Sequence, residues 1–511
     1  MNNKILFFIL VAGLLSLHAL PSEKTLSLRA SADGLRDTVI YPVIPGDFAD
    51  PSVIRNGNMY YAAGTSSEWA PQYPLYTSTD LRKWKQAGYI FPHTPSWASS
   101  SFWAPELFYH NGTYFVYYTA RKKADNISCI GVATSKDPMK GFTDQGTVLE
   151  FGKEAIDAFI TESEGKLYMS FKAYGLDNRP IELLCYQLSD DGLKTVGEPF
   201  MLMRDDNRIG LEGQCLIRRN NYYYLFYSAG NCCGRECSYQ VHVARSATLK
   251  GPYIKYEHNP VLSGGGNWKC TGHGTIVQTA GGEDYYLGHA YSKTQDVYTG
   301  RQGMLSKITW NAKTGWPSFT MLSGTKPSGF KDEFTATTLQ NNWQWDFRHT
   351  QPEIKIEKGL LLLSGAISAD NVTGTALTVR PYQPDYAIST VVMNHNASLK
   401  GLVVYGDAGQ AAGIGIRGDS VVTWYVKENT FTVLHKEQVS SKAPIHLKIV
   451  ARNGSKLSFY WSDVAGKWKT IAGSEPFFNG DFLPPWDRSP RPGLLQKGDV
   501  PALFDFFEIR Y

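Results

Sequence analysis

Apolar and polar residues alternate in short stretches along the first part of the chain, and tight turns of glycine, asparagine or glutamate join these stretches in pairs. Alternation with a period of two predicts β-strands, and a two-residue turn between two such stretches predicts a β-hairpin. The second strand of each pair is rich in aromatic residues. The pattern recurs in residues 50–64, 102–120, 156–174, 211–230 and 272–291.

The hairpins follow one another at intervals of about 50–60 residues, which leaves room for two more strands in each unit. Self-similarity at this period is typical of the blades of a β-propeller. The sequence therefore predicts a five-bladed β-propeller over residues 41–325. In a propeller the first strand of each blade lines the central channel, so residues far apart in the sequence meet at the end of that channel.

A second region, residues 328–511, also alternates between apolar and polar positions and has almost no helical periodicity. It predicts a β-sandwich, so the fold class is all-β, a five-bladed β-propeller followed by a β-sandwich. The proline-rich stretch FLPPWDRSPRPG, residues 482–493, is expected to be a surface loop. Four tryptophans are expected to be buried in the sandwich, with carbohydrate binding as the alternative: Trp343, Trp345, Trp424 and Trp461.

The first residues contain a lysine, an apolar stretch too short to span a bilayer, and then a small residue at Ala19. This order predicts a secretory signal peptide over residues 1–20 and a secreted or periplasmic protein. No later segment is apolar enough to cross a membrane. The net charge of the 511 residues is only +4, without a run of Lys and Arg, which argues against a nucleic-acid partner.

All seven cysteines follow the predicted signal peptide, and three of them lie in the stretch NCCGREC, residues 231–237. An oxidising compartment permits a disulfide in this stretch, and the odd number leaves at least one thiol unpaired. A zinc site is the alternative, but the stretch lacks a second pair of ligands at zinc-like spacing. We therefore expect the cysteines to be structural.

Three acidic residues, Asp50, Asp157 and Glu212, stand at the start of the first strand in copies one, three and four. Taken singly, each could be an ordinary turn or surface residue. Their matching positions predict that they converge at one end of the channel. Inverting glycoside hydrolysis needs a carboxylate and a carboxylic acid roughly 6.5–9.5 Å apart. A third carboxylate nearby raises the pKa of the acid by repulsion between like charges.

The stretches GDFADPSVI, FWAPELF, AIDAF and LEGQCLI, in this order on a five-fold repeat, resemble glycoside hydrolase family 43. The resemblance implies that Asp50 is the general base that activates water and that Glu212 is the general acid. It makes Asp157 the residue that modulates the pKa of Glu212. It also implies inversion at the anomeric carbon and a concanavalin-like C-terminal sandwich. The chain departs from the family where Gln214 follows Gly213, since many relatives have proline there.

The resemblance suggests further site residues. Trp103 and Phe48 are expected to contact the sugar, and Arg301 to bind hydroxyls of the terminal sugar, with packing or a surface salt bridge as the alternatives. His273 stands where arabinan-cleaving members hold a cation, so a structural calcium ion is an option, although no cofactor is required. Glu106 is expected to be structural.

The resemblance implies an exo-acting enzyme that removes terminal α-L-arabinofuranosyl or β-D-xylosyl residues from plant cell-wall polysaccharides or oligosaccharides. Alternatives are an endo-arabinanase, a galactan-active member of the same family, or a sugar-binding propeller without catalysis. Fructan-cleaving propeller enzymes carry Asn-Asp-Pro-Asn where this chain has Ala-Asp-Pro-Ser, residues 49–52, which disfavours that activity.

Overall fold

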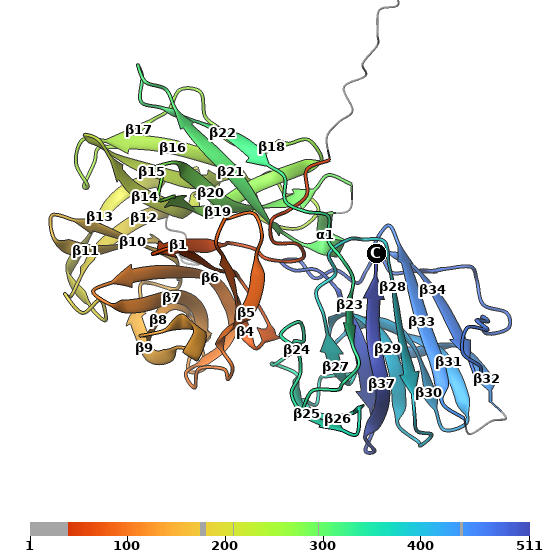
Figure 1. Ribbon diagram of the computed structural model, residues 1–511. Helices are drawn as coiled ribbons and strands as arrows, with labels where there is room; N and C mark the ends of the chain where they lie inside the picture. The colour runs from red at the N-terminus through yellow and green to blue at the C-terminus, as the bar shows by residue number, and fades with distance from the viewer. Residues whose placement is uncertain (1–38, 174–179, 208, 295, 440–442) are drawn as a thin grey trace, which may run out of the picture. The chain divides into compact units, whose positions relative to one another are not determined.

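Strands make up nearly all of the regular structure in this computed structural model, which describes residues 39–511 except 174–179, 208, 295 and 440–442 (Figure 1). The predicted signal peptide lies outside the described residues. The described part contains a 3-10 turn, Pro138–Lys140, and a single α-helical turn, α1 (Asp296–Thr299). No helix in it is long and apolar enough to cross a membrane.

The N-terminal part forms five antiparallel sheets, coloured from red to green in Figure 1. Blade 1 comprises β1 (Ser52–Asn56), β2 (Met59–Ala63), β4 (Gln72–Ser78) and β5 (Lys85–Phe91). Blade 2 comprises β6 (Ala98–His110), β7 (Thr113–Lys122), β8 (Ser128–Ser135) and β9 (Thr143–Leu149). Blade 3 comprises β10 (Ala155–Ser163), β11 (Lys166–Ala173), β12 (Ile181–Leu188) and β13 (Thr195–Asp205). Blade 4 comprises β14 (Glu212–Arg219), β15 (Tyr222–Ala229), β16 (Gln240–Ser246) and β17 (Ile254–Lys255). Blade 5 comprises β18 (Gly264–Gly265), β19 (Trp268–Gln278), β20 (Asp284–Ser292), β21 (Gln302–Trp310) and β22 (Pro317–Leu322).

The inner strands β1, β6, β10, β14 and β19 contact one another in this order, and β19 contacts β1, so the ring of blades is closed. The segment before β1 adds to the closure, because Ile44 pairs with Gly303 of β21 in the last blade. The five-bladed propeller predicted from the repeated hairpins is therefore confirmed.

A residue in the left-handed backbone region recurs at an equivalent place in the five blades, just before β1 and within β6, β10, β14 and β19, and β6 and β19 each have a second one, Ser101 and Cys270. The recurring residues are Asp50 (φ 50°), Ala104 (φ 41°), Asp157 (φ 59°), Gly213 (φ 58°) and His273 (φ 21°). In β6, β10, β14 and β19 this position coincides with an irregularity in the pairing to the next strand. Such bulges redirect side chains away from the sheet. Asp50, Asp157 and His273 thus occupy equivalent positions, and Glu212 stands one residue earlier in its strand.

The C-terminal part is a sandwich of two antiparallel sheets. The first sheet contains, in spatial order, β25 (Thr350–Glu357), β26 (Leu360–Ile367), β37 (Ala502–Arg510), β28 (Tyr386–Val392), β33 (Ile445–Arg452), β34 (Lys456–Ser462) and β35 (Phe478–Asn479), and β23 (Phe330–Asp332) also pairs with β37. The second contains β27 (Thr375–Thr378), β36 (Arg491–Lys497), β29 (Leu399–Asp407), β30 (Gln410–Arg417), β31 (Ser420–Lys427) and β32 (Thr430–Gln438). Trp343, Trp424 and Trp461 are buried, as expected, and Trp345 is partly buried against the core.

The two halves share hydrogen bonds. The short strands β3 (Trp69–Ala70) and β24 (Trp345–Asp346) pair with each other. The buried Arg380 of the sandwich donates to the hydroxyl of Tyr76 through Nη2 and to the carbonyl of Asp47 through Nη1, at 3.3 Å for the latter. These contacts join the sandwich to β3, to β4 and to the segment that precedes β1.

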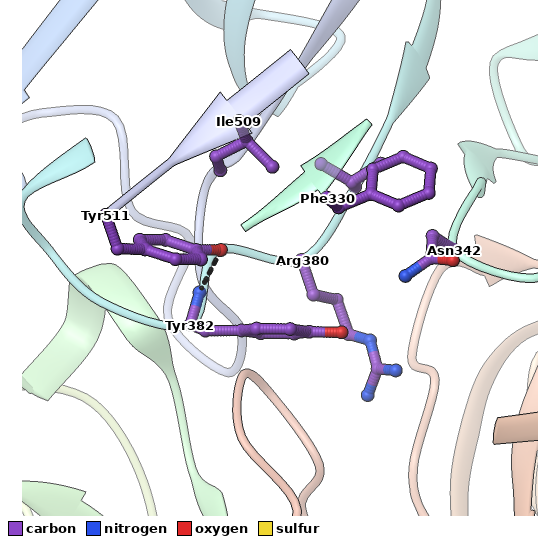
Figure 2. Close-up of a pocket in the computed structure, with 7 residues that line it drawn as sticks. Phe330, Asn342, Arg380, Tyr382, Ile509 and Tyr511 are labelled. Carbon is purple, nitrogen blue, oxygen red and sulfur yellow. Dashed lines mark hydrogen bonds between the residues drawn. The ribbon is translucent and has the colours of Figure 1, made fainter. Parts of the chain in front are cut away.

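Figure 2 shows the surroundings of Arg380 at the end of the chain. The rings of Tyr382 and Tyr511 lie stacked, with centroids 5.8 Å apart. The backbone N–H of Tyr382 donates to the hydroxyl of Tyr511 at 2.9 Å. The C-terminal residue is therefore held against the residues that connect the sandwich to the propeller.

The proline-rich stretch, residues 482–493, is only in part the surface loop that its composition predicts, because Trp486 is exposed but residues from Arg491 onward belong to β36. Ser489 and Arg491 are buried. The backbone N–H of Ser489 donates to Asp47 at 3.0 Å, and the guanidinium of Arg491 lies 4.1 Å from the ring centre of Trp69. The polar groups of the loop find partners on the propeller, which composition cannot show.

Two disulfides, Cys232–Cys233 and Cys237–Cys270, involve the predicted stretch 231–237, so the expected disulfide there is confirmed. The free cysteines among the described residues are buried, one in each of three blades: Cys129 in β8, Cys185 in β12 and Cys215 in β14. Burial raises the pKa of all three thiols, that of Cys129 to about 12.

Candidate active site

A cavity of about 640 Å³ contains side chains from several blades at one end of the channel. Asp50, Asp157 and Glu212, which belong to blades 1, 3 and 4, all line it. The structure therefore brings these three residues together, as the repeat predicts. All three are largely shielded from solvent, with side-chain exposures of 9%, 8% and 17%.

Asp50 is held by positively charged and polar groups. Nη1 of Arg301 donates to its Oδ1 at 3.1 Å, and the hydroxyl of Thr65 donates to its Oδ2 at 2.7 Å. Its backbone N–H donates to Nδ1 of His289 at 3.0 Å. Burial disfavours ionisation, but Arg301 and the neighbouring histidines outweigh burial and hold the pKa of Asp50 well below its usual range. Asp50 is therefore ionised and faces the cavity as a carboxylate.

Asp157 accepts hydrogen bonds from the strand that carries Glu212. The backbone N–H of Gly213 donates to Oδ2 of Asp157 at 3.1 Å. The side-chain amide of Gln214 donates to the backbone carbonyl of Asp157. The side-chain amide of Gln214 thus adds a second hydrogen bond between β14 and the strand that carries Asp157. The two carboxylates are thus fixed relative to each other.

Glu212 has two hydrogen-bond donors that the sequence analysis did not identify. Nζ of Lys172, in β11, donates to its Oε2, and the hydroxyl of Tyr239 donates to its Oε1 at 2.8 Å. Lys172 is also buried. A lysine inside the apolar strand MSFKA was a usable signal, because a buried ammonium requires a nearby carboxylate.

The pKa shifts of Asp157 and Glu212 differ from the expectation that Asp157 raises the pKa of Glu212. Burial raises the pKa of Asp157 to about 6, with His273 opposing and Glu212 adding to the rise. Burial also acts on Glu212, but Lys172 and the hydrogen bonds from Lys172 and Tyr239 outweigh it and lower the pKa. In the free protein the higher pKa therefore belongs to Asp157.

The other predicted site residues divide into two groups. Trp103, His273 and Arg301 line the cavity, and the guanidinium of Arg121 lies 5.7 Å from the ring centre of Trp103. Phe48 does not line it. Its side chain is fully buried and packs edge-on against Tyr76, 5.2 Å between centroids. We therefore assign Phe48 to the core and not to a sugar contact, because it faces the interior of blade 1.

Arg301 is not a surface residue. It is buried, and its Nη2 donates to the backbone carbonyl of Asp487 at 3.1 Å. Asp487 and Trp486 belong to the proline-rich loop of the sandwich and line the cavity. No sequence signal linked this loop to the carboxylates, since it lies in the other domain and its partners are scattered over the propeller.

Glu106 is buried, and the hydroxyl of Ser52 donates to its carboxyl group at 2.7 Å. Burial raises its pKa to about 8. It does not line the cavity, in agreement with the structural role that we expected.

His273 faces two carboxylates, with Nδ1 3.6 Å from Oδ1 of Asp50 and 3.8 Å from Oδ2 of Asp157. Calcium takes about six to eight oxygen ligands. Among the described residues there is no group of three or more His, Cys, Asp or Glu side chains arranged to hold a metal ion. A cation beside His273 therefore stays a prediction from sequence.

The arrangement provides one ionised carboxylate, one carboxyl group with a pKa near neutrality and one carboxylate paired to a lysine, all facing the same space. Carboxylates in different surroundings can divide acid and base roles in the hydrolysis of a glycosidic bond. The aromatic ring of Trp103 and the donors of Arg301 add groups that suit a sugar.

Comparison with known proteins agrees with this chemistry. The family profile described as glycosyl hydrolases family 43 matches residues 40–317, and the profile described as the beta xylosidase C-terminal concanavalin A-like domain matches residues 331–483. The chain is 30% identical over 311 residues to the extracellular exo-alpha-(1->5)-L-arabinofuranosidase ArbA of Cellvibrio japonicus, covering 53% of this chain and 86% of that protein. It is 28% identical over 330 residues to the extracellular endo-alpha-(1->5)-L-arabinanase 1 of Bacillus subtilis, covering 61% of this chain and 95% of that protein.

Among solved structures, the crystal structure of xylan beta-1,4-xylosidase from Bacillus halodurans is similar in fold, with a TM-score of 0.80 and 20% identity over 93% of this chain and all of that chain. The likeness covers the propeller and the sandwich together. From its family profile, its carboxylates and its fold, the chain belongs to glycosyl hydrolases family 43.

Proposed function

We propose that the protein is an inverting, exo-acting glycoside hydrolase that removes terminal α-L-arabinofuranosyl residues from arabinose-containing polysaccharides or oligosaccharides. The observation that carries the proposal is the meeting of Asp50, Asp157 and Glu212 in one cavity with three different electrostatic surroundings. The arabinose preference rests on the two relatives described above, which are named for arabinofuranose and for arabinan.

In the proposed reaction Asp50 accepts a proton from a water molecule whose oxygen bonds to the anomeric carbon. The bond from that carbon to the leaving oxygen breaks, and Glu212 donates a proton to this oxygen. The low pKa of Asp50 suits a base that must be ionised before water attacks. No covalent bond to the enzyme forms, so configuration inverts.

Glu212 must carry a proton for this step, yet Lys172 lowers its pKa in the free protein. We infer that substrate draws Lys172 toward a sugar hydroxyl and that the proton held near Asp157 then becomes available to Glu212. Asp157 tunes the acid in this way, through a proton shared within the pair.

Exo action is favoured by the sandwich, which supplies Trp486 and Asp487 to the wall of the cavity. A wall on this side suits a chain end better than the middle of a polymer. A β-xylosidase is the second candidate, supported by the beta xylosidase description of the C-terminal profile. Secretion is proposed because the two relatives described above are named extracellular.

The test compares 4-nitrophenyl α-L-arabinofuranoside with 4-nitrophenyl β-D-xyloside, using wild type, Asp50→Ala and Glu212→Ala. We expect turnover of the arabinoside, its loss in Asp50→Ala, and residual turnover in Glu212→Ala because nitrophenolate needs little protonation. NMR of the first product anomer tests inversion. Release of long oligomers from arabinan before arabinose would contradict exo action, and near-normal activity in Asp50→Ala would contradict the role of Asp50.

A further inference from the structure

Two loops bound the cavity on a side that the proposed mechanism leaves unused. One is the cysteine loop, residues 230–238, which follows β15 in blade 4, and the other is the proline-rich loop, residues 482–490, which precedes β36. Cys232 and Cys233 line the cavity from the first loop and Trp486 lines it from the second. The loops touch, since a Cβ added to Gly234 would stand 3.6 Å from Cδ1 of the Trp486 indole.

The surface that they form is apolar, with the indole of Trp486 open to solvent, Cys232 partly exposed and Cys233 only 4% exposed. The three most exposed large apolar side chains among the described residues are Ile254 (69%), Ile209 (67%) and Trp486 (63%). Ile209 and Trp486 line this cavity. Exposed apolar surface at the edge of a polar site is typical of a ligand-binding position. An indole face and disulfide sulfurs are both polarisable surfaces that suit the C–H face of a sugar ring.

The surface lies on the side of the proposed acid. Gly210 lies two residues before Glu212, and Gly230 lies two residues before Cys232. The two glycines pack against each other, because a Cβ added to Gly210 would stand 2.7 Å from the carbonyl oxygen of Gly230. The general acid donates its proton to the leaving oxygen, so a wall beside Glu212 borders the leaving group.

The two loops are fixed before any ligand binds. Nη2 of Arg235, in the cysteine loop, donates to the hydroxyl of Tyr298 at 3.0 Å and to the carbonyl of Asp481 at 3.2 Å. The hydroxyl of Tyr298 donates to the carboxylate of Asp481 at 2.9 Å. The Cys237–Cys270 disulfide ties the other end of the loop to β19. A preorganised wall loses little entropy when a ligand binds.

We propose that the Cys232–Cys233 disulfide and the indole of Trp486 form a leaving-group subsite, which binds the second sugar ring of a short oligosaccharide. The proposal rests on the proposed hydrolytic function and adds the part of the substrate that this wall recognises.

The test uses two substrates with the same terminal sugar, the glycosyl fluoride, whose leaving group has no ring, and the disaccharide. The variants are Trp486→Ala and the double variant Cys232→Ser/Cys233→Ser. We expect KM for the disaccharide to rise about five- to tenfold in either variant, while kcat/KM for the fluoride stays within about twofold of wild type. Phe477→Ala is the matched control, since Phe477 is a 46% exposed aromatic residue of the sandwich that does not line this cavity.

Equal losses on both substrates would overturn the subsite, because they would place the effect on the terminal sugar or on the fold. Unchanged KM for the disaccharide would also overturn it. Failure of the proposed function is distinct, since wild type would then hydrolyse neither substrate. In that event calorimetry of disaccharide binding to wild type and Trp486→Ala decides the subsite, and equal affinity overturns it.

Discussion

Lys172 sets the charge on the acidic pair. Burial alone would lower the pKa of its ammonium, but Glu212 and Asp157 outweigh burial and raise that pKa, so Lys172 stays charged. A single cation thus compensates a carboxylate that would otherwise be costly to bury. The distribution of protons in the site depends on this residue as much as on the acids.

We expect Lys172→Met to raise the pKa of Glu212, because the variant removes the cation that favours the ionised form. The pH at which kcat/KM falls on the alkaline side should move upward by about 1–3 pH units. A pH profile of kcat/KM measures the shift, and Lys172→Arg, which keeps the charge, is the control. An alkaline limb that stays in place in Lys172→Met would refute the assignment of Glu212 as the acid.

Glu106 makes stability depend on pH. Its pKa is raised from 4.5 to about 8 in the folded state. Between these values the unfolded chain has lost a proton that the folded chain keeps, so the free energy of unfolding falls as pH rises and levels off above about 8. The total loss is about 5 kcal/mol at most.

Glu106→Gln imitates the protonated side chain and removes this dependence. Relative to wild type, the variant should be similar in stability near pH 4.5 and should gain progressively up to about pH 8. Urea unfolding at several pH values measures the difference. A gain that does not grow with pH would show that Glu106 is already ionised in the folded protein.

At the scale of elements, the cysteine loop leads directly into Tyr239, which contacts the proposed acid Glu212. The backbone N–H of Tyr239 donates to Sγ of Cys270, and its ring stacks on His289 with centroids 5.7 Å apart and an angle of 7°. Its hydroxyl donates to Glu212 at 2.8 Å. Tyr239 therefore bonds directly to the proposed acid, Glu212, and stacks on His289, which accepts a hydrogen bond from the backbone of the proposed base, Asp50.

Removing the Cys237–Cys270 disulfide as Cys237→Ser/Cys270→Ser should lower the free energy of unfolding by about 2–4 kcal/mol and should also lower kcat. Tyr239→Phe keeps the stacked ring and loses only the hydroxyl, so it should lower kcat with little change in unfolding. Urea unfolding and initial rates separate the two effects. Full activity in Tyr239→Phe would mean that its hydrogen bond does not position Glu212.

The hairpins could be predicted from sequence because each is local, with alternating strands and a turn residue between them. Asp50, Asp157 and Glu212 could be placed at one channel end because the repeat fixes equivalent positions. Phe48 was misplaced, the proline-rich loop was predicted only in part, and Lys172 and Trp486 were missed. The position of each depends on side chains distant in sequence, such as Tyr76 for Phe48 and Asp47 for the loop, which no local pattern encodes.

At the scale of the whole molecule, propeller and sandwich share buried polar contacts, among them those of Arg380. Removing this guanidinium leaves the acceptors on Tyr76 and Asp47 without a donor, while Gln86 keeps only the hydroxyl of Tyr76 as a donor. Such losses cost about 1–3 kcal/mol for each buried group. The two halves should therefore unfold as one cooperative unit in the wild-type protein.

We expect a single calorimetric transition in wild type and, in Arg380→Ala, a destabilisation of about 3 kcal/mol with separation into two transitions. Arg510→Ala is the control, because the side chain of Arg510 is 75% exposed. Two transitions already in wild type would contradict the coupling of the halves.

The unpaired thiols offer a separate use of this architecture. Cys129, Cys185 and Cys215 lie in three successive blades, and each is shielded from solvent with its thiolate disfavoured. A thiol reagent reaches each one only when its own blade opens. Pulse labelling followed by mass spectrometry would thus measure the rate at which each of three neighbouring blades opens in the wild-type protein, from the labelling rate of its own cysteine.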